Sequence, residues 1–252
     1  MRIQEIWRYP VKSLQGEKLS EAAIDESGLR GDRCWGVRDE TTGKILTGRR
    51  EPQLLLAAAT LAEDGELNIA LPSGDVCRGS GSGTDLALSE WLRRPVTLVG
   101  AADAPGGEAE FFADATDDTS EAVAWTMPPG RFVDAMPLLL LTTASLRTGA
   151  ALHPTGEWSV RRFRPNLLID AAGDGWLEDD WCGSTVHIGS IAVVPRQGCV
   201  RCTMVTRPQR ELVRDLDIYK TLARNHDGTF GVWTQVQTPG DVHVNDIVTV
   251  AK

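Results

Sequence analysis

Short apolar stretches separated by turn-forming residues recur along this chain and limit what it can fold into. Many of them mix β-branched or aromatic residues in near alternation, as half-buried strands do, and glycine, proline, asparagine or aspartate commonly separates them. They lie at 4–11, 34–38, 54–61, 67–71, 134–141, 167–170, 188–194, 230–236 and 247–250. This pattern predicts a mainly β protein in which many short strands form barrels.

Helical spacing interrupts the strands in three places. Thr84 or Asp85 can cap a first short helix, and Thr142 or Thr143 can cap a second. A third helix is predicted near 212–225, where apolar residues keep approximately helical spacing. The expected fold class is therefore mainly β with a few short helices.

The chain has 252 residues, enough for one large β-rich domain or for two smaller ones. Between residues 100 and 130 the composition shifts to Ala, Asp, Gly, Pro and Glu, with few large apolar residues. We interpret this part as a segment that crosses between two units without forming a packed element. The predicted organisation is a domain at 1–100, a crossing segment at 101–130 and a domain at 131–252.

Charge and apolar content exclude several classes of function. The formal net charge of -9 argues against general binding to nucleic acid or to an acidic membrane surface. No apolar run reaches the roughly 18 residues of a membrane-spanning helix, and the first residues lack a secretory signal pattern. Five cysteines, an odd number, fit thiols in a reducing compartment. We expect a soluble, cytoplasmic protein that contacts no membrane.

The sequence GCVRC at 198–202 is a candidate reactive site. It places Arg201 between the thiols of Cys199 and Cys202, directly after an apolar strand. A cationic neighbour lowers the pKa of a thiol and favours the thiolate, which binds metals and attacks electrophiles. Two cysteines at this spacing also occur by accident in strands, where cysteine acts as a small apolar residue.

The sequence RRFRPN at 161–166 concentrates positive charge in an acidic chain. Arg161, Arg162 and Arg164 could pair with the acidic residues at 178–180, as surface ion pairs commonly do. They could also grip a phosphate through paired, charge-assisted hydrogen bonds. Asn166 adds an amide that donates and accepts, as recognition of a heterocycle edge requires. This combination indicates a phosphate or pterin site.

Two further positions carry polar groups at the ends of strands or in turns. Lys12 and Ser13 follow the first strand and could bind an anion, although such residues are more often only solvated. Arg33 lies in a glycine-containing turn, where an ion pair with Asp32 or another carboxylate is the simpler explanation.

Four motifs together resemble those of the MOSC family, the carboxy-terminal domain family of molybdenum cofactor sulfurases. They are YPVKS at 9–13, GDRCW at 31–35, RRFRPN at 161–166 and GCVRC at 198–202. Their order and spacing are similar to those of family members that reduce amidoximes. The resemblance covers nearly the whole chain and implies an N-terminal MOSC-type β-barrel domain followed by a MOSC β-barrel domain.

The resemblance also implies roles for particular residues. Cys202 would ligate molybdenum, and Asp134 would lie near the metal and relay protons, although a strand-end aspartate also commonly makes only a turn hydrogen bond. Ala135 and Met136 replace hydroxyl residues of the animal enzymes, and Trp233 replaces a tyrosine. The implied cofactor-binding residues are Lys12, Ser13, Arg33, Arg164, Asn166, Val200 through its backbone, Arg201, Cys202 and Trp233.

The implied activity is that of a molybdenum-cofactor-binding oxidoreductase that reduces N-hydroxylated small molecules. The chain shows no cysteine-rich ferredoxin extension and no dinucleotide fingerprint, so we expect electrons from a separate ferredoxin-, flavin- or cytochrome-type protein. The alternative is a carrier, in which Cys202 bears a persulfide or the protein delivers the cofactor without catalysis. A less favoured alternative is a zinc site built from Cys182, His187, Cys199 and Cys202.

Overall fold

The structure is a computed structural model that describes residues 1–103, 107–112, 114–115 and 122–251. Its strands are β1 (Arg2–Arg8), β2 (Glu17–Leu19), β3 (Glu21–Asp25), β4 (Gly28–Leu29), β5 (Trp35–Asp39), β6 (Ala58–Leu61), β7 (Leu67–Ala70), β8 (Val76–Arg78), β9 (Val96–Gly100), β10 (Glu108–Phe112), β11 (Ala122–Thr126), β12 (Leu138–Thr142), β13 (Leu167–Asp170), β14 (Val186–Ile188), β15 (Ile191–Val200), β16 (Thr229–Thr238), β17 (Gly240–His243) and β18 (Val248–Val250). Its helices are α1 (Ser82–Leu92), α2 (Thr143–Leu152), α3 (Val160–Phe163), α4 (Leu216–Asn225) and the 3-10 helices η1 (Pro52–Leu56), η2 (Leu177–Trp181) and η3 (Thr203–Thr206). The mainly β class with a few short helices is confirmed.

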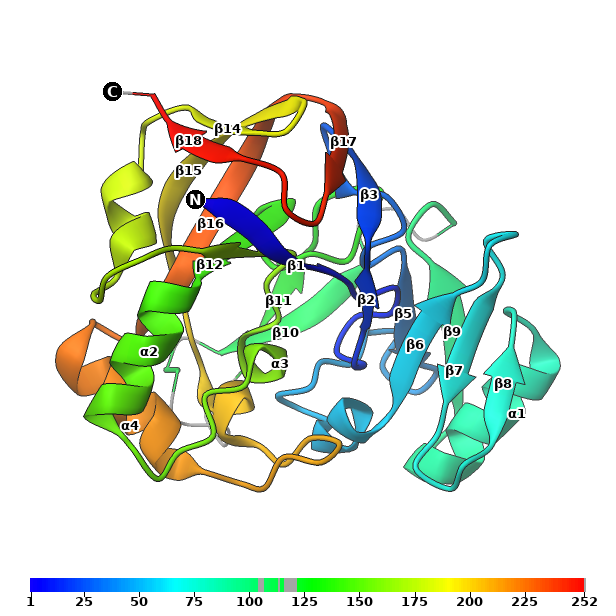
Figure 1. Ribbon diagram of the computed structural model, residues 1–252. Helices are drawn as coiled ribbons and strands as arrows, with labels where there is room; N and C mark the ends of the chain where they lie inside the picture. Colours follow the sequence, from blue (N-terminus) through cyan, green and yellow to red (C-terminus); the bar gives the residue numbers. More distant parts are fainter. Residues whose placement is uncertain (104–106, 113, 116–121, 252) are drawn as a thin grey trace.

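The largest sheet has eight strands in the order β18-β14-β15-β16-β12-β13-β1-β2 (Figure 1). Its neighbours are antiparallel except β12 and β13, which run parallel. Parallel neighbours need a crossover connection, and α2 and α3 lie in it. One face of the sheet buries a core that includes Ile3, Val193 and Val232. Apolar residues of α2, α4 and η3 form another core with Leu141, Phe230 and their neighbours.

The eight strands do not close into the barrel that the strand pattern predicted. Among the described residues, β18 and β2 lie at opposite ends of the sheet order. An isolated bridge joins Arg2 to Ile247, and the Ile3 amide donates to the Asp246 carbonyl over 3.0 Å. The Val248 amide at the start of β18 also donates to the Met1 carbonyl over 2.9 Å, but the contact stays a single bridge and forms no regular ladder.

A third core lies among elements from the first hundred residues. Strands β6, β7 and β8 form one sheet, β5 pairs with β9, and α1 packs beside them on the right in Figure 1. Leu54, Leu88 and Leu98 are buried between them. Strand pairing nevertheless crosses residue 100, because β1 and β2 belong to the large sheet and β3 pairs with β17. The boundaries at 100 and 131 stay predictions.

Three local expectations were wrong. Strands β10 and β11 pair across five residues within the segment expected to lack a packed element, and Ala109 and Met127 are buried there. At 54–61 the chain first forms η1, because Pro52 suits the start of a helix, and only then β6. At 134–141 the strand begins only at Leu138, after Pro137, which has no amide hydrogen to donate to a ladder.

Glu178 connects η2 to the start of α2 from a fully buried position. The hydroxyls of Thr142 and Ser145 donate to its Oε2 over 2.6 and 2.7 Å, and Thr142 also caps α2. Its Oε1 is buried without a hydrogen-bond partner among the described residues. Burial raises the pKa of Glu178 above its ordinary value, although both hydroxyls act in the opposite direction.

This shift predicts a pH dependence that Glu178→Gln should remove. A carboxyl whose pKa is raised by folding binds more protons in the folded state, so stability falls as pH rises above about 4.5 toward the folded pKa. The variant should show a flatter profile of unfolding free energy against pH, equal to the wild type below that range and at least as stable at pH 7. Urea unfolding between pH 4 and 8 measures this, and a glutamine variant that is less stable at pH 7 contradicts it.

Candidate functional site

Lys12 and Asp134 form an ion pair between distant parts of the chain. The Lys12 Nζ lies 2.5 Å from Asp134 Oδ1 and donates to the Phe132 carbonyl over 3.1 Å. Lys12 is buried, whereas the Asp134 side chain is 78% exposed. Desolvation acts to raise the pKa of Asp134, but the charges of Lys12, Arg33 and Arg164 outweigh it and lower that pKa. Asp134 is therefore a solvent-facing carboxylate at neutral pH.

Arg33 and Asp32 form a largely buried ion pair beside Tyr9. The Arg33 guanidinium contacts the Asp32 carboxylate, which also accepts a hydrogen bond from the Tyr9 amide over 2.7 Å. Burial acts to lower the pKa of Arg33, but the Asp32 carboxylate raises it above its ordinary value. The guanidinium carbon also lies 5.1 Å from the centre of the Tyr9 ring. These contacts fix the direction in which Arg33 points.

Arg164 is the second guanidinium over the same ring. Its carbon lies 4.3 Å from the centre of the Tyr9 ring, and its Nη1 donates to the Leu14 carbonyl over 2.7 Å. Its Nη2 is buried and has no hydrogen-bond partner among the described residues. Burial and then the neighbouring charge of Arg33 lower the pKa of Arg164 to about 10. A buried donor beside a like charge is costly to leave unsatisfied, so this position favours an anion.

Three of the expected site residues share an uncommon backbone conformation. Ser13, Arg33 and Arg164 have φ angles of 70°, 51° and 55°, in the left-handed region that L residues seldom adopt. Such strain persists only where surrounding structure enforces it, and it is concentrated at functional sites. Ser13 contributes through its Oγ, which accepts a hydrogen bond from the Gly48 amide over 2.8 Å. The side chains of Arg33 and Arg164 are thereby turned toward Tyr9.

Cys202 lies at the start of η3, immediately after β15. It is partly buried, and its carbonyl accepts the Val205 amide over 3.3 Å. Arg201 beside it is buried and donates to the carbonyls of Phe163 and Phe230, the former over 2.9 Å. Arg201 therefore fixes the backbone before Cys202 rather than offering a vacant fork to a ligand.

Cys199 differs from Cys202 in its surroundings. It is buried on β15, and burial raises the pKa of its thiol to about 11, although Arg201 acts in the opposite direction. The charges of Asp134, Cys202 and Arg33 also act on Cys199, so these groups lie in one neighbourhood. The structure thus brings the Cys199 thiol into the neighbourhood of Asp134 and Arg33, two members of the charged cluster, with Cys202 close to Cys199.

Asn166 uses its side chain to join strands. Its Oδ1 accepts the Leu139 amide over 3.1 Å, and its Nδ2 donates to the Trp7 carbonyl over 3.3 Å. It is almost fully buried immediately before β13, two residues after Arg164. The amide therefore positions Arg164 through the backbone, and the expected recognition of a heterocycle edge stays a prediction.

Two segments of the chain match family models of known domains. Residues 1–104 match the MOSC N-terminal beta barrel domain, and residues 129–249 match the MOSC domain. The chain belongs to the MOSC family. The assignment agrees with the geometry, because the clustered side chains come from both matched segments.

Curated relatives cover most of this MOSC chain at low identity. The mouse and human proteins called mitochondrial amidoxime-reducing component 1 are each 27% identical to it, over 98% of the chain and 81% and 82% of their own lengths. The molybdenum cofactor sulfurase of Drosophila grimshawi is 26% identical over 89% of the chain, which spans only 31% of that protein.

Two expected residues of the MOSC site lie outside the hydrogen-bonded cluster. Trp233 is on β16, opposite Leu139 and Gln197, and within the described part of the chain no hydrogen bond or ring contact joins it to the cations. Val200 ends β15 with 58% of its side-chain surface exposed. Their roles toward a cofactor stay predictions.

Motif reasoning left Tyr9 without a role and expected Asp32 only as an ion-pair partner of Arg33, which the structure shows it to be. Tyr9 is fully buried with both guanidinium groups over its ring, and Asp32 pairs with Arg33 and accepts the Tyr9 amide. Both belong to the quoted motifs YPVKS and GDRCW. Both residues were therefore inside the recognised motifs, but only the fold shows that Asp32 of one motif binds the backbone of Tyr9 in the other.

Two alternatives drawn from the sequence were wrong for the described residues. Arg161 pairs with Glu211, and Arg162 donates to backbone carbonyls, so neither pairs with the acidic residues at 178–180. The zinc alternative fails as well, because no group of three or more His, Cys, Asp or Glu in the described ranges could hold a metal ion.

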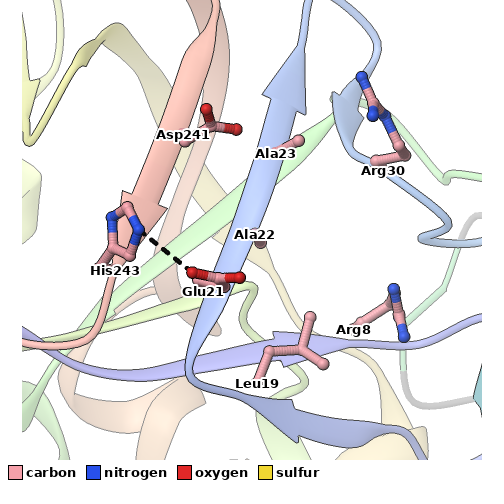
Figure 2. A pocket seen from close by; sticks show the side chains of 8 residues that line it. All are labelled: Arg8, Leu19, Glu21, Ala22, Ala23, Arg30, Asp241 and His243. Atoms are coloured by element: carbon pink, nitrogen blue, oxygen red, sulfur yellow. Dashed lines mark ion pairs between the residues drawn. The ribbon is translucent and has the colours of Figure 1, made fainter. Parts of the chain in front are cut away.

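A separate hollow of about 430 Å³ lies beside β3 and β17 (Figure 2). Its lining mixes both charges, with Glu21 3.3 Å from the His243 Nε2 on one side and Arg8 and Arg30 on the other. None of the expected MOSC site residues lines it. Within the described residues, the structure also contains no helix long and apolar enough to cross a membrane.

Proposed function

We propose that this MOSC protein binds a molybdenum cofactor and reduces N-hydroxylated small molecules with electrons from a separate protein. The observation that carries the cofactor assignment is the buried Arg164 Nη2, which has no partner among the described residues. It lies in a cluster where Lys12, Arg33 and Arg164 outnumber the carboxylates of Asp32 and Asp134. A phosphate would satisfy the vacant donor and offset the excess positive charge.

The donor set also fits a molybdenum centre near η3. A thiolate is a soft ligand, and Cys202 is the less buried of the two cysteines there. In the proposal Cys202 ligates the metal, while Lys12, Arg33 and Arg164 hold the anionic part of the cofactor. Ser13, Asn166 and Arg201 hold the backbone in place, and Val200 and Trp233 contribute contacts nearby. The bound cofactor supplies the redox chemistry, and the protein supplies orientation and electrostatics.

Asp134 is the proposed proton-transfer group. Its lowered pKa means that it is ionised at neutral pH, so its carboxylate is a weak base that gives up a bound proton readily. The Lys12 ammonium holds Oδ1, and the exposure of the side chain gives it access to water. Asp134 can thus pass protons between solvent and a substrate beside Cys199 and Cys202.

The reductase part of the proposal is supported by the names of the mouse and human relatives. The similarity to the Drosophila grimshawi sulfurase supports a second candidate, a carrier whose Cys202 bears a persulfide. Metal analysis and intact mass spectrometry of the purified protein separate the two. Molybdenum with a fluorescent oxidised pterin, together with viologen-driven reduction of benzamidoxime, supports the reductase. A sulfur adduct on Cys202 without metal or activity overturns it.

Arg164→Met should lower cofactor content about tenfold, as loss of a supporting group around a metal site commonly does. The variant keeps a side chain of similar length but removes the donors that face the cluster. Arg161→Met is the matched control, because Arg161 is three residues away and pairs with Glu211 near the surface. Molybdenum and pterin per protein measure the outcome. Equal losses in both variants, or none in Arg164→Met, contradict the assignment.

A further inference from the structure

The 207–215 loop connects the turn that contains Cys202 to α4. Cys202 caps η3, and the loop begins at the next residue after that helix. The Asp215 amide donates to the Thr206 carbonyl over 2.9 Å, so the two ends of the loop meet. Gln209 and Leu212 exchange two backbone hydrogen bonds of 2.9 Å within it. The loop runs along the lower edge of the view in Figure 1, leading into α4.

Buried contacts hold the inner side of this loop in one shape. The fully buried Arg162 donates to the carbonyls of Val205, Arg207 and Val213 over 3.3, 3.4 and 2.8 Å. Gln15 donates to the Gln209 side chain over 2.9 Å, and Leu212 is buried beneath. A surface that is already ordered loses little conformational entropy when a partner binds.

The outer side of the loop combines exposed apolar groups with positive charge. Val213 and Leu216 are 74% and 47% exposed. Arg210 and Arg214 are also exposed, and neither makes an ion pair within the described residues, whereas Glu211 is paired with Arg161. Exposed apolar residues flanked by arginines are typical of protein interfaces. Two unpaired arginines on this outer side of the loop are unusual in a chain whose formal net charge is -9.

We propose that Arg210, Val213, Arg214 and Leu216 form the docking surface for an acidic electron-transfer protein. This inference rests on the proposed function, which requires an external electron donor. The loop follows Cys202 after the short helix η3, and the Asp215 amide returns to the Thr206 carbonyl, so both ends of the loop lie one short helix from Cys202. The remaining acidic surface repels an acidic partner, while the two arginines attract it, and this contrast orients the encounter.

The two arginines and two apolar residues of this loop are less suited to binding a lipid surface. Lipid-binding segments commonly carry four to eight basic residues, whereas this surface has two unpaired arginines, with Glu211 and Asp217 exposed beside them. A protein partner can match two charges and a small apolar centre specifically. If this surface binds anionic vesicles and not ferredoxin, the partner is a lipid surface and the proposal is wrong.

The test uses a plant-type [2Fe–2S] ferredoxin, an acidic one-electron carrier, as the probe. Arg210→Glu combined with Arg214→Glu should weaken ferredoxin binding about tenfold at low salt and raise the ferredoxin KM by a similar factor. Reduction driven by reduced methyl viologen should be unchanged, because this small donor needs no docking surface. Wild-type binding should weaken as salt increases. The matched control is Arg30→Glu with Arg78→Glu, two exposed arginines elsewhere on the molecule.

Several results would overturn the proposal. The first is that the wild-type protein does not bind ferredoxin in a salt-sensitive way. The second is that the loop variant binds ferredoxin as well as the control variant does. The third is that the loop variant also loses viologen-driven activity. Loss of retention on phosphatidylserine vesicles, with ferredoxin binding intact, would assign the surface to lipid. Failure of the proposed function gives a different result. The wild-type protein would then not reduce benzamidoxime with viologen, but the loop variant would still bind ferredoxin more weakly than the wild type.

Discussion

Cys202→Ala is expected to leave the purified protein with less than a tenth of the wild-type molybdenum and with no reductase activity. A metal held by one protein thiolate loses its only covalent bond to the chain when that sulfur is removed. The cations would still attract the anionic part of the cofactor, so pterin should fall less steeply than metal. Elemental analysis and pterin fluorescence on the same sample measure the two losses separately.

Cys199→Ala is the matched control for this prediction. Cys199 is three residues away but buried on β15, where its thiol favours the protonated form that is a poor ligand. We expect the control to retain molybdenum close to the wild-type level. If Cys202→Ala keeps its metal, or if both variants lose it equally, the thiolate of Cys202 is not the ligand.

Local pattern predicted the strands whose side chains alternate or are uniformly apolar. The stretch at 167–170 is β13 over the same residues, and 67–71 differs from β7 by one residue. The pair β10 and β11 escaped prediction because its surroundings are rich in Ala, Asp and Glu, and its buried face is formed by small or isolated residues such as Ala109. The absence of a closed barrel was also not predictable, because the contact between Arg2 and Ile247 joins the two ends of the chain and no local pattern shows that it stays a single bridge.

The candidate site was predictable as a set of residues but not as an arrangement. The motifs supplied Lys12, Arg33 and Arg164, and the fold brings their charges together around Asp134. Sequence alone could not show which polar groups are already satisfied. The side chains of Asn166 and Arg201 bond to backbone from other strands and helices, whereas one nitrogen of Arg164 does not. Such pairings depend on contacts between segments more than a hundred residues apart in some cases, as for Arg164 and Leu14.

Arg162 is expected to matter for stability more than any other arginine of the RRFRPN motif. It is fully buried and donates to four backbone carbonyls, those of Glu157, Val205, Arg207 and Val213. A buried ion pair can often be replaced by apolar residues at little cost, because both charges then disappear. Here the acceptors belong to the backbone and stay behind when the guanidinium is removed.

Arg162→Met should therefore lower the free energy of unfolding by roughly 3 to 5 kcal/mol, since four buried or part-buried carbonyls lose their donor at about 1 kcal/mol each. Arg161→Met should change it by less than about 1 kcal/mol, because that arginine makes only a partly exposed ion pair. Urea unfolding at pH 7 measures both values. Equal stabilities of the two variants would mean that the hydrogen bonds of Arg162 do not hold the 207–215 loop in shape, and other contacts would then have to order the docking surface.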